Sequence, residues 1–320
     1  MLLSVLFSLC ACAPQEPSPV PAAESAPASR PLTTFSFRWP AGSRGRVKEA
    51  QSIDGVDLAM SARIELVPLE GGESVLRRSE PRIESYRGYG PTHPFVIKMI
   101  TRLEEASPLQ PAFAVGAAGE WRGLTNYAEI AADLVARQVE AGLAPEEEQQ
   151  ALQRLLDPAE QARAERKVRE QWNAWCLHWL DMPLQGAWSD TRDLLLDLPS
   201  GKQGRTGTVE RRVRGLETRA GVSCWHVSRF EQRSGPWFFK HFGGQLPQLL
   251  PGLELSRVRA CTLLDQTEAW LDAETLRPLE VVRRYSLRAD LKPGDSQQEV
   301  EARKTQIVTT WTFDWEVPAK

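Results

Sequence analysis

Apolar and polar residues alternate with a period of two over most of the chain after residue 33, which predicts strands with one buried face. TTFSFRW (33–39) has an aromatic residue at every second position and is expected to be a strand. The same alternation occurs in VDLAMSARIELVPL (56–69), FVIKMITRLEEA (95–106), AFAVGAAGEWRGL (112–124) and TQIVTTWTFDWEV (305–317), and with a central turn in 206–232 and 266–287.

Helical spacing replaces this alternation between residues 124 and 182. Asn126, with Glu129 three positions later, is typical of a capping box that begins a helix. Pro145 and Asp157-Pro158 begin two further helices, because proline favours the first helical turn. The third helix carries one apolar stripe for packing, made of Val168, Trp172, Trp175 and Trp179.

These elements predict one α+β domain that spans residues 33–320. It consists of a large curved antiparallel β-sheet, an unclosed half-barrel, with the helical insert at about 124–182 packed on one face. A chain of this length is long enough to build one large hydrophobic core.

The N-terminal segment resembles the start of a bacterial lipoprotein precursor. Met1–Leu9 is apolar but too short to span a bilayer, which takes about 20 residues. Leu9-Cys10-Ala11-Cys12 resembles the lipobox, which implies a signal peptide at 1–11 and lipidation of Cys12. The alternative is a short buried segment, but the Pro- and Ala-rich stretch that completes 12–32 is typical of an extended tether instead.

The same resemblance implies a place in the bacterial cell envelope. A protein with several acyl chains on its N-terminal cysteine is held firmly at a membrane without a transmembrane helix. Ala13 follows Cys12 where many proteins retained in the inner membrane have Asp. We therefore expect the periplasmic side of the outer membrane.

One hairpin resembles a second group of envelope proteins. AWLDAETLRPLEVV (269–282) is similar to a W-L-D-x-x-T-x-x-P hairpin of LolA-like and LppX-like proteins. The resemblance implies an unclosed barrel with helices across its mouth, which holds a lipid or acyl chain between sheet and helices. It covers one hairpin and the order of strands, helices and strands, so it assigns no ligand-binding residue.

Composition narrows the class of partner. The net charge is −3, from 39 basic and 42 acidic residues, which argues against a nucleic-acid-binding protein. The chain has 11 tryptophans. These residues are typical either of an aromatic-lined cavity or of a tryptophan-rich core.

Three cysteines follow Cys12 in the chain. An oxidising compartment favours pairing of two of them. Cys224 and Cys261 both lie in strand-like stretches, so we expect a disulfide between them, with Cys176 left over.

The sequence lacks the common motifs of catalytic and metal-binding sites. Cys176-Leu177-His178 and Cys224-Trp225-His226 could supply the four ligands of a structural zinc site, but the first pair lies on an expected helix, where residues two apart point to different sides. No nucleophile elbow, metalloprotease motif or EF-hand loop is present, and GKQGRTGT (201–208) lacks the Gly-Lys-Ser/Thr of a phosphate loop. We expect no catalytic residue, no metal and no cofactor.

GPWFFKHFGG (235–244) is the most unusual local sequence, since aromatic residues lie between glycines. It is expected to be either a mobile flap over an apolar ligand or a segment tucked into the core. The aromatic residues concerned are Trp237, Phe238, Phe239 and Phe242.

We therefore expect a non-catalytic envelope lipoprotein that binds a lipid or another apolar ligand between its sheet and its helices. The alternative is a structural or protein-interaction lipoprotein with a filled core and no small-molecule ligand. A hydrolase with dispersed catalytic residues is a third hypothesis. A cavity above about 300 Å³ would distinguish the first from the second.

Overall fold

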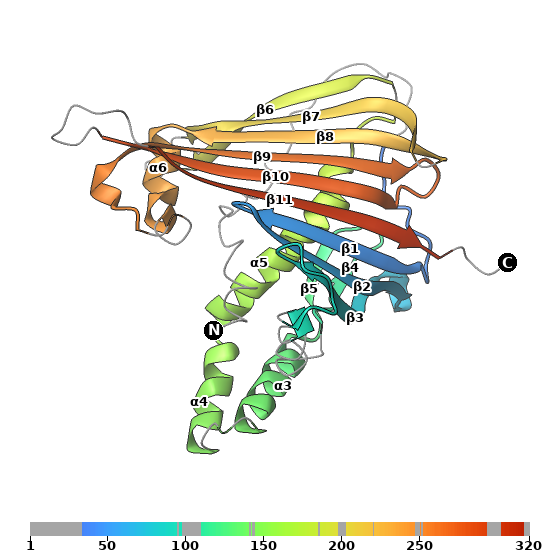
Figure 1. The fold of residues 1–320 in the computed structure, drawn as a ribbon. Helices are drawn as coiled ribbons and strands as arrows, with labels where there is room; N and C mark the ends of the chain where they lie inside the picture. The colour runs from blue at the N-terminus through green and yellow to red at the C-terminus, as the bar shows by residue number, and fades with distance from the viewer. Residues whose placement is uncertain are drawn as a thin grey trace.

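The strands form one open antiparallel sheet. The computed structural model describes residues 34–94, 96–97, 110–140, 142, 145–184, 186–197, 203–219, 221–246, 250, 252–292 and 302–316. In these ranges the sheet has 11 strands in the order β5-β4-β3-β2-β1-β11-β10-β9-β8-β7-β6, and it does not close (Figure 1). The predicted α+β class with a curved, unclosed sheet is confirmed. The signal peptide, Cys12, the tether and most of 95–106 lie outside the described residues. Residues 96–97, the described part of the strand expected at 95–106, are helical, so that expectation is wrong there.

The first strand of the domain lies in the middle of the sheet. β1 pairs with β2 on one side and with the last strand, β11, on the other. The strands are β1 Arg44–Ile53, β2 Val56–Pro68, β3 Ser74–Tyr86, β4 Phe113–Val115, β5 Trp121–Leu124, β6 Trp188–Asp197, β7 Gln203–Arg219, β8 Val222–Ser234, β9 Val258–Asp272, β10 Pro278–Leu291 and β11 Ala302–Trp315.

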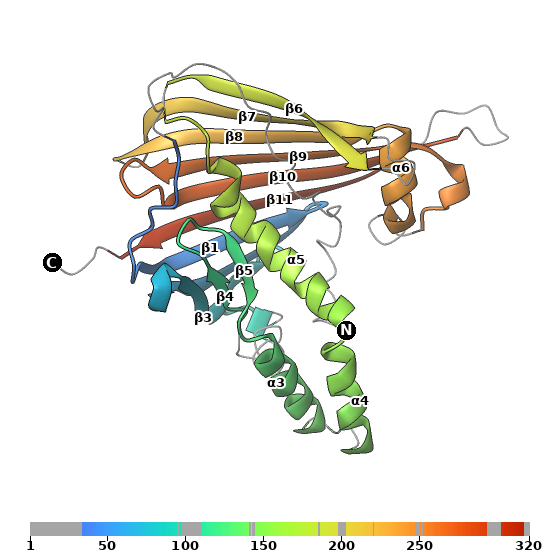
Figure 2. The same cartoon turned by 180° about the vertical axis from the view of Figure 1, so that it is seen from behind.

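Three helices come between β5 and β6. They are α3 Tyr127–Glu140, α4 Pro145–Leu155 and α5 Pro158–Trp175, and a short 3-10 turn, η2 Leu177–Trp179, follows them. α5 crosses one face of the sheet, whereas α3 and α4 project away from it as a hairpin (Figure 2). The start of α5 is as predicted, because Asp157 accepts a hydrogen bond from Ala159 N at 2.8 Å ahead of Pro158. Every helix in the described residues is too short or too polar to span a bilayer.

Alternate residues of β9 show that two apolar clusters share one face of the sheet. Ala269 and Leu271 belong to a cluster under α5, and Cys261 and Leu263 belong to a cluster under the short helix α6 Pro236–Phe242. Residues two apart on a strand point to the same face. Both helices therefore lie on one side, called here the covered face.

The hairpin that carries the LolA-like resemblance turns as predicted. β9 ends at Asp272, whose Oδ1 accepts hydrogen bonds from Thr275 N and Thr275 Oγ1, both at 2.7 Å. Leu276 then has a φ of 55°, and Asp272 N donates to Arg277 O at 2.8 Å. The other predicted hairpins, β4–β5 and β7–β8, are also present.

The prediction of a strand at 33–39 is wrong. Thr34 makes one isolated antiparallel bridge, to Pro183, and residues 35–40 join no sheet. Residues 34–40 instead cross the covered face as an irregular segment, called here the strap. A strand at this point could not pair with β1, the next strand in the chain, because β1 is already paired on both sides.

Candidate functional site

The strap keeps the alternation seen in the sequence but packs against the core instead of in a ladder. Phe35 N donates to Met182 O at 2.7 Å, and Asp181 N donates to Phe35 O at 3.0 Å. Phe35 and Trp39 are buried, with 1% and 6% of their surface exposed, whereas the residues between them include exposed Ser36 and Arg38. The aromatic side chains of the strap therefore point toward the sheet.

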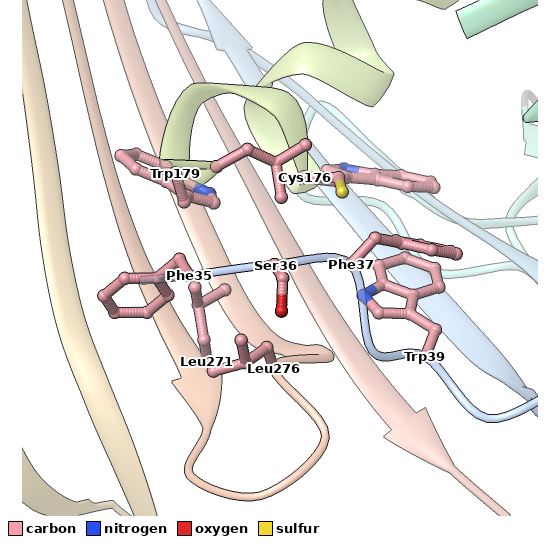
Figure 3. Close-up of a pocket in the computed structure, with 10 residues that line it drawn as sticks. Phe35, Ser36, Phe37, Trp39, Cys176, Trp179, Leu271 and Leu276 are labelled. Carbon is pink, nitrogen blue, oxygen red and sulfur yellow. The ribbon is translucent and has the colours of Figure 1, made fainter. Parts of the chain in front are cut away.

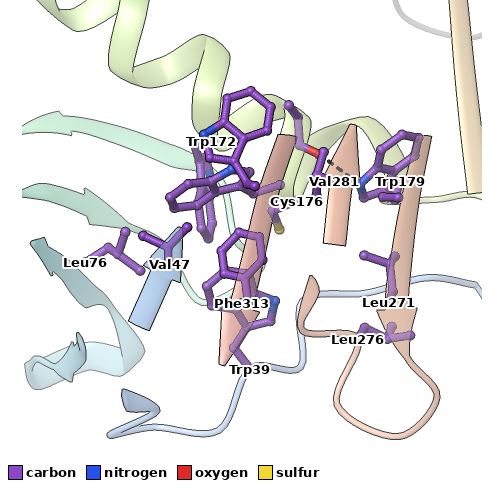
Figure 4. Packing of buried hydrophobic residues seen from close by; sticks show 14 of the residues in the cluster. Trp39, Val47, Leu76, Trp172, Cys176, Trp179, Leu271, Leu276, Val281 and Phe313 are labelled. Carbon is purple, nitrogen blue, oxygen red and sulfur yellow. Dashed lines mark hydrogen bonds between the residues drawn. The ribbon is translucent and has the colours of Figure 1, made fainter. Parts of the chain in front are cut away.

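The tryptophans of α5 and η2 meet the strap from the other side. The predicted stripe is correct: Trp172, Trp175 and Trp179 are all at most 1% exposed. Trp172 Nε1 donates to Gly119 O at 2.8 Å, and its ring lies 5.1 Å from that of Trp39 in an edge-on arrangement. In Figure 4, Trp172 and Trp179 extend from the helical segment and Phe313 extends from a strand of the sheet. The rings of Phe313 and Trp175 lie 5.0 Å apart between centroids. The aromatic cluster, as it is called here, consists of Trp39, Trp172, Trp175, Trp179 and Phe313.

A small cavity remains inside the aromatic cluster. Its volume is about 10 Å³, room for about one water molecule, whereas ligand pockets usually exceed ~300 Å³. In Figure 3 the strap passes between η2 on one side and the β9–β10 turn on the other. The lining residues are Phe35, Ser36, Phe37, Trp39, Trp175, Cys176, Trp179, Leu180, Leu271 and Leu276.

A band of charged side chains separates the aromatic cluster from the cluster under α6. Arg283 Nε and Nη2 donate to the two oxygens of Asp265 at 3.0 and 2.7 Å. Glu170 of α5 approaches Arg283 Nη1 at 3.4 Å, so the band also joins α5 to the sheet. The carboxylate of Glu231 bonds to both Arg229 and Arg233.

Burial shifts the titration of this polar band. Burial alone would raise the pKa of Asp265, but the charge and hydrogen bonds of Arg283 outweigh it and hold the pKa below its usual range. Burial raises the pKa of Glu170, and Arg283 only partly opposes this. Burial, followed by the charge of Arg229, holds the pKa of His178 well below 6.5. His178 Nδ1 has no hydrogen-bond partner within the described ranges.

This band was not predicted from the sequence. Arg229, Glu231 and Arg233 follow Val227 at a period of two, a pattern that is usually read as a solvated face. Their burial depends on the elements that pack over the sheet, which the pattern of one strand does not reveal. The three charged residues point to the same side of the strand as the apolar Val227, which is fully buried. This shared side was the signal in the sequence that could have indicated their burial.

The four aromatic residues predicted as a flap lie on α6. Phe238 and Phe242 are each 1% exposed and stack at 4.9 Å on the cluster under α6. Phe239 is partly buried, and Trp237, 40% exposed, lies over Gly204 of β7. Two of the four are thus anchored in the core, as the tucked-in alternative requires.

The predicted disulfide between Cys224 and Cys261 is wrong. All three described cysteines are free and buried. Cys224 pairs in register with Asp272, eleven residues along β9 from Cys261, a distance of about 36 Å at ~3.3 Å per residue. Disulfides need Cα atoms within about 7 Å. Burial raises the pKa of the Cys261 thiol to about 11 and also raises that of Cys176.

The two Cys-x-His pairs lie on opposite faces of the sheet. Cys176 and His178 are on the covered side, between α5 and the sheet. Cys224 and His226 share the other face with Trp270, which stacks on His226 at 4.6 Å. In the part of the chain that the structure describes, no three Cys, His, Asp or Glu residues are grouped as metal ligands.

Comparison with known proteins gives no family. No family model matches the chain, and no curated protein matches it. A structure of lipid–protein interactions in lipovitellin shares 10% identity over 88% of this chain, with a TM-score of 0.37. The chain spans about a quarter of the lipovitellin chain, 26% of its length.

Two bacterial structures are similar over comparable lengths. A domain described as an outer membrane lipoprotein-sorting protein domain from Vibrio parahaemolyticus shares 8% identity, covering 88% of this chain and 87% of that one, with a TM-score of 0.24. A DUF1329 family protein from Desulfovibrio piger ATCC 29098 shares 8% identity over 87% of each chain, with a TM-score of 0.17. TM-scores below 0.5 do not establish a shared fold, so function has to be argued from the residues of this chain.

Proposed function

We propose that this protein is a non-catalytic envelope lipoprotein, anchored through Cys12, that binds a lipid or other acyl-bearing ligand on the covered face of its sheet. One observation carries the proposal. The apolar part of that face under α5 is covered by segments outside the sheet, namely the strap and α5 with η2. Such a cover can move while the ladder of the sheet stays intact, because no strand pairing depends on it.

The cavity of about 10 Å³ corresponds to a closed, ligand-free form in this proposal. A ligand of several hundred daltons needs a larger space, which opening of the cover supplies. The non-catalytic role is supported by the location of the histidines that lie near carboxylates. His226, whose Nδ1 lies 3.4 Å from Glu217 Oε2, is on the face of the sheet opposite the cavity, and His178 lies near Asp265. Neither His178 nor Asp265 lines the cavity, so a molecule held there would not meet them.

The second candidate is a structural or protein-interaction lipoprotein. The same small cavity favours it, since a core filled by tryptophans needs no ligand for its stability. In this case the strap and α5 are permanent parts of the core.

Native mass spectrometry of residues 32–320, which include every described element, distinguishes the two candidates. We expect an additional mass of several hundred daltons that is lost on activation and is identified as lipid. A protein without bound mass, and without uptake of added fatty acid, would favour the structural role.

Anchoring is tested separately in the full chain. Labelled palmitate should enter the membrane-bound wild-type protein and should not enter a Cys12→Ser variant. Labelling that persists in Cys12→Ser would contradict the proposed anchor.

A further inference from the structure

The strap is attached to the body of the protein by few polar contacts. Its backbone makes two hydrogen bonds with the segment after η2, through Met182 and Asp181, and one isolated bridge between Thr34 and Pro183. β1 begins only at Arg44, so the ladder of the sheet does not include the strap. It can therefore leave the covered face without breaking a strand pair.

Its inward side chains contact carbon-rich surface. Phe35 lies 5.7 Å from the ring of Trp225, and Trp39 lies 5.3 Å from that of Trp315. Phe37 lies 5.9 Å from the ring of Trp172. The sheet side of the cavity consists of Leu271 and Leu276, and among the lining residues only Ser36, of the strap itself, has an oxygen atom in its side chain.

We propose that the strap is an internal substitute for the ligand, and that an unbranched acyl chain binds in the slot that the strap now fills. The inference rests on the proposed function and deepens it by naming the site and the ligand class. A single segment of this length occupies a narrow slot that is at most about 25 Å long. An acyl chain matches a slot that is long, narrow and lined by carbon, whereas a compact or charged ligand does not.

The bridge between Thr34 and Pro183 offers a way to lock the strap. Residues opposite each other at such a bridge have Cα atoms about 5 Å apart, within the range of a disulfide. The double variant Thr34→Cys/Pro183→Cys should therefore hold the strap in place when oxidised and release it when reduced. Each single variant, treated with the same oxidant, is the matched control.

The assay uses the full lipidated chain in nanodiscs of phosphatidylethanolamine and phosphatidylglycerol, with a diazirine-bearing palmitate as the probe. After irradiation, labelled peptides are mapped by mass spectrometry. We expect the reduced double variant and both single variants to be labelled at the slot, in peptides that contain Trp225 or Leu271. In the oxidised double variant we expect labelling of these peptides to fall at least tenfold and to return on reduction.

Two other outcomes overturn the inference, and they are distinguishable. Equal labelling of the slot in the oxidised and reduced double variant would show that acyl chains enter without moving the strap, while the proposed lipid binding survives. No labelling of the covered face in any variant or in the wild-type protein would refute both the inference and the proposed function. Urea unfolding of the oxidised protein verifies that the lock leaves the fold intact.

Discussion

The contact between the strap and the β4–β5 turn can be tested at Gly119. This glycine has a φ of +84°, and a Cβ built on it would lie 2.9 Å from Cβ and Cγ of Phe37. A residue with a Cβ at such a φ costs about 1–2 kcal/mol. Forcing the Phe37 ring aside adds about 1–3 kcal/mol, as for other overpacked sites. We therefore expect Gly119→Ala to lower the free energy of unfolding by about 2–5 kcal/mol.

Gly55 provides the matched control. It has the same φ of +84°, in the β1–β2 turn, but nothing lies within 4 Å of its added Cβ. Gly55→Ala should cost only the backbone term of about 1–2 kcal/mol. The difference between the two variants isolates the contact with the strap.

The assay is urea unfolding followed by tryptophan fluorescence, with Phe37→Ala as the third member of a double-mutant cycle. In the Phe37→Ala background, Gly119→Ala should cost less than in the wild-type background, because the ring atoms are gone, but still more than Gly55→Ala, because Cβ of residue 37 remains 2.9 Å from the added Cβ. Equal destabilisation by the two glycine variants in the wild-type background would refute the packing of Phe37 against the turn. It would also show that Phe37 does not help to hold the strap on the covered face.

Three further predictions concern the polar band and the thiols. Arg283→Met leaves the buried Asp265 carboxylate without its partner and should cost about 3–5 kcal/mol in urea unfolding at pH 7. Because Arg283 lowers the folded-state pKa of Asp265, the difference in free energy of unfolding between wild type and Arg283→Met should shrink as pH falls through that pKa. The control Arg284→Met, on the opposite face, should cost about 1 kcal/mol or less at any pH. The folded-state pKa of His178 lies below its unfolded value of 6.5, so the unfolded chain binds more protons and the free energy of unfolding should fall from pH 7 to pH 5. His178→Gln should remove this contribution to the pH dependence of the urea unfolding midpoint. Ellman's reagent should react with the buried thiols only after unfolding, and the intact mass should show no loss of two hydrogens; a fast-reacting native thiol would contradict their burial. These thiols are Cys176, Cys224 and Cys261.

Alternation along the chain predicted the sheet well because most of its strands bury one face only. β9 is a clear case, with buried and partly exposed residues in turn over most of its length, and so is the last part of β10, from Leu287 to Leu291. The strap has the same alternation but is not a strand of the sheet. Period two shows that a segment is extended with one apolar side, but it does not show whether a neighbouring strand is free to pair. Both edges of β1 are occupied, by β2 and by β11 from the other end of the chain.

Local signals also predicted some positions for the wrong reason. Asn126 precedes α3, as expected for a capping residue, but its side chain links two backbone groups of the preceding loop instead. Asn126 Oδ1 accepts from Ala112 N at 2.8 Å, and Nδ2 donates to Gln110 O at 2.9 Å. The disulfide failed for a related reason. The sequence placed Cys224 and Cys261 in strands but did not show how those strands pair. The observed register of β8 and β9 places the two residues far apart and on opposite faces of the sheet.

The polar band limits where an apolar ligand can bind. The covered face has apolar residues under α5 and under α6, but Asp265 and Thr267 of β9 lie between the two regions and are at most 7% exposed. An acyl chain laid along the full length of the face would have to pass over the Asp265–Arg283 pair and shield it further from water, which is unfavourable for charged groups. The chain would therefore remain on one side of the band. Of the two sides, the region under α5 contains the cavity that the strap lines, and this is why the slot of the strap, and not α6, is the better site for the ligand.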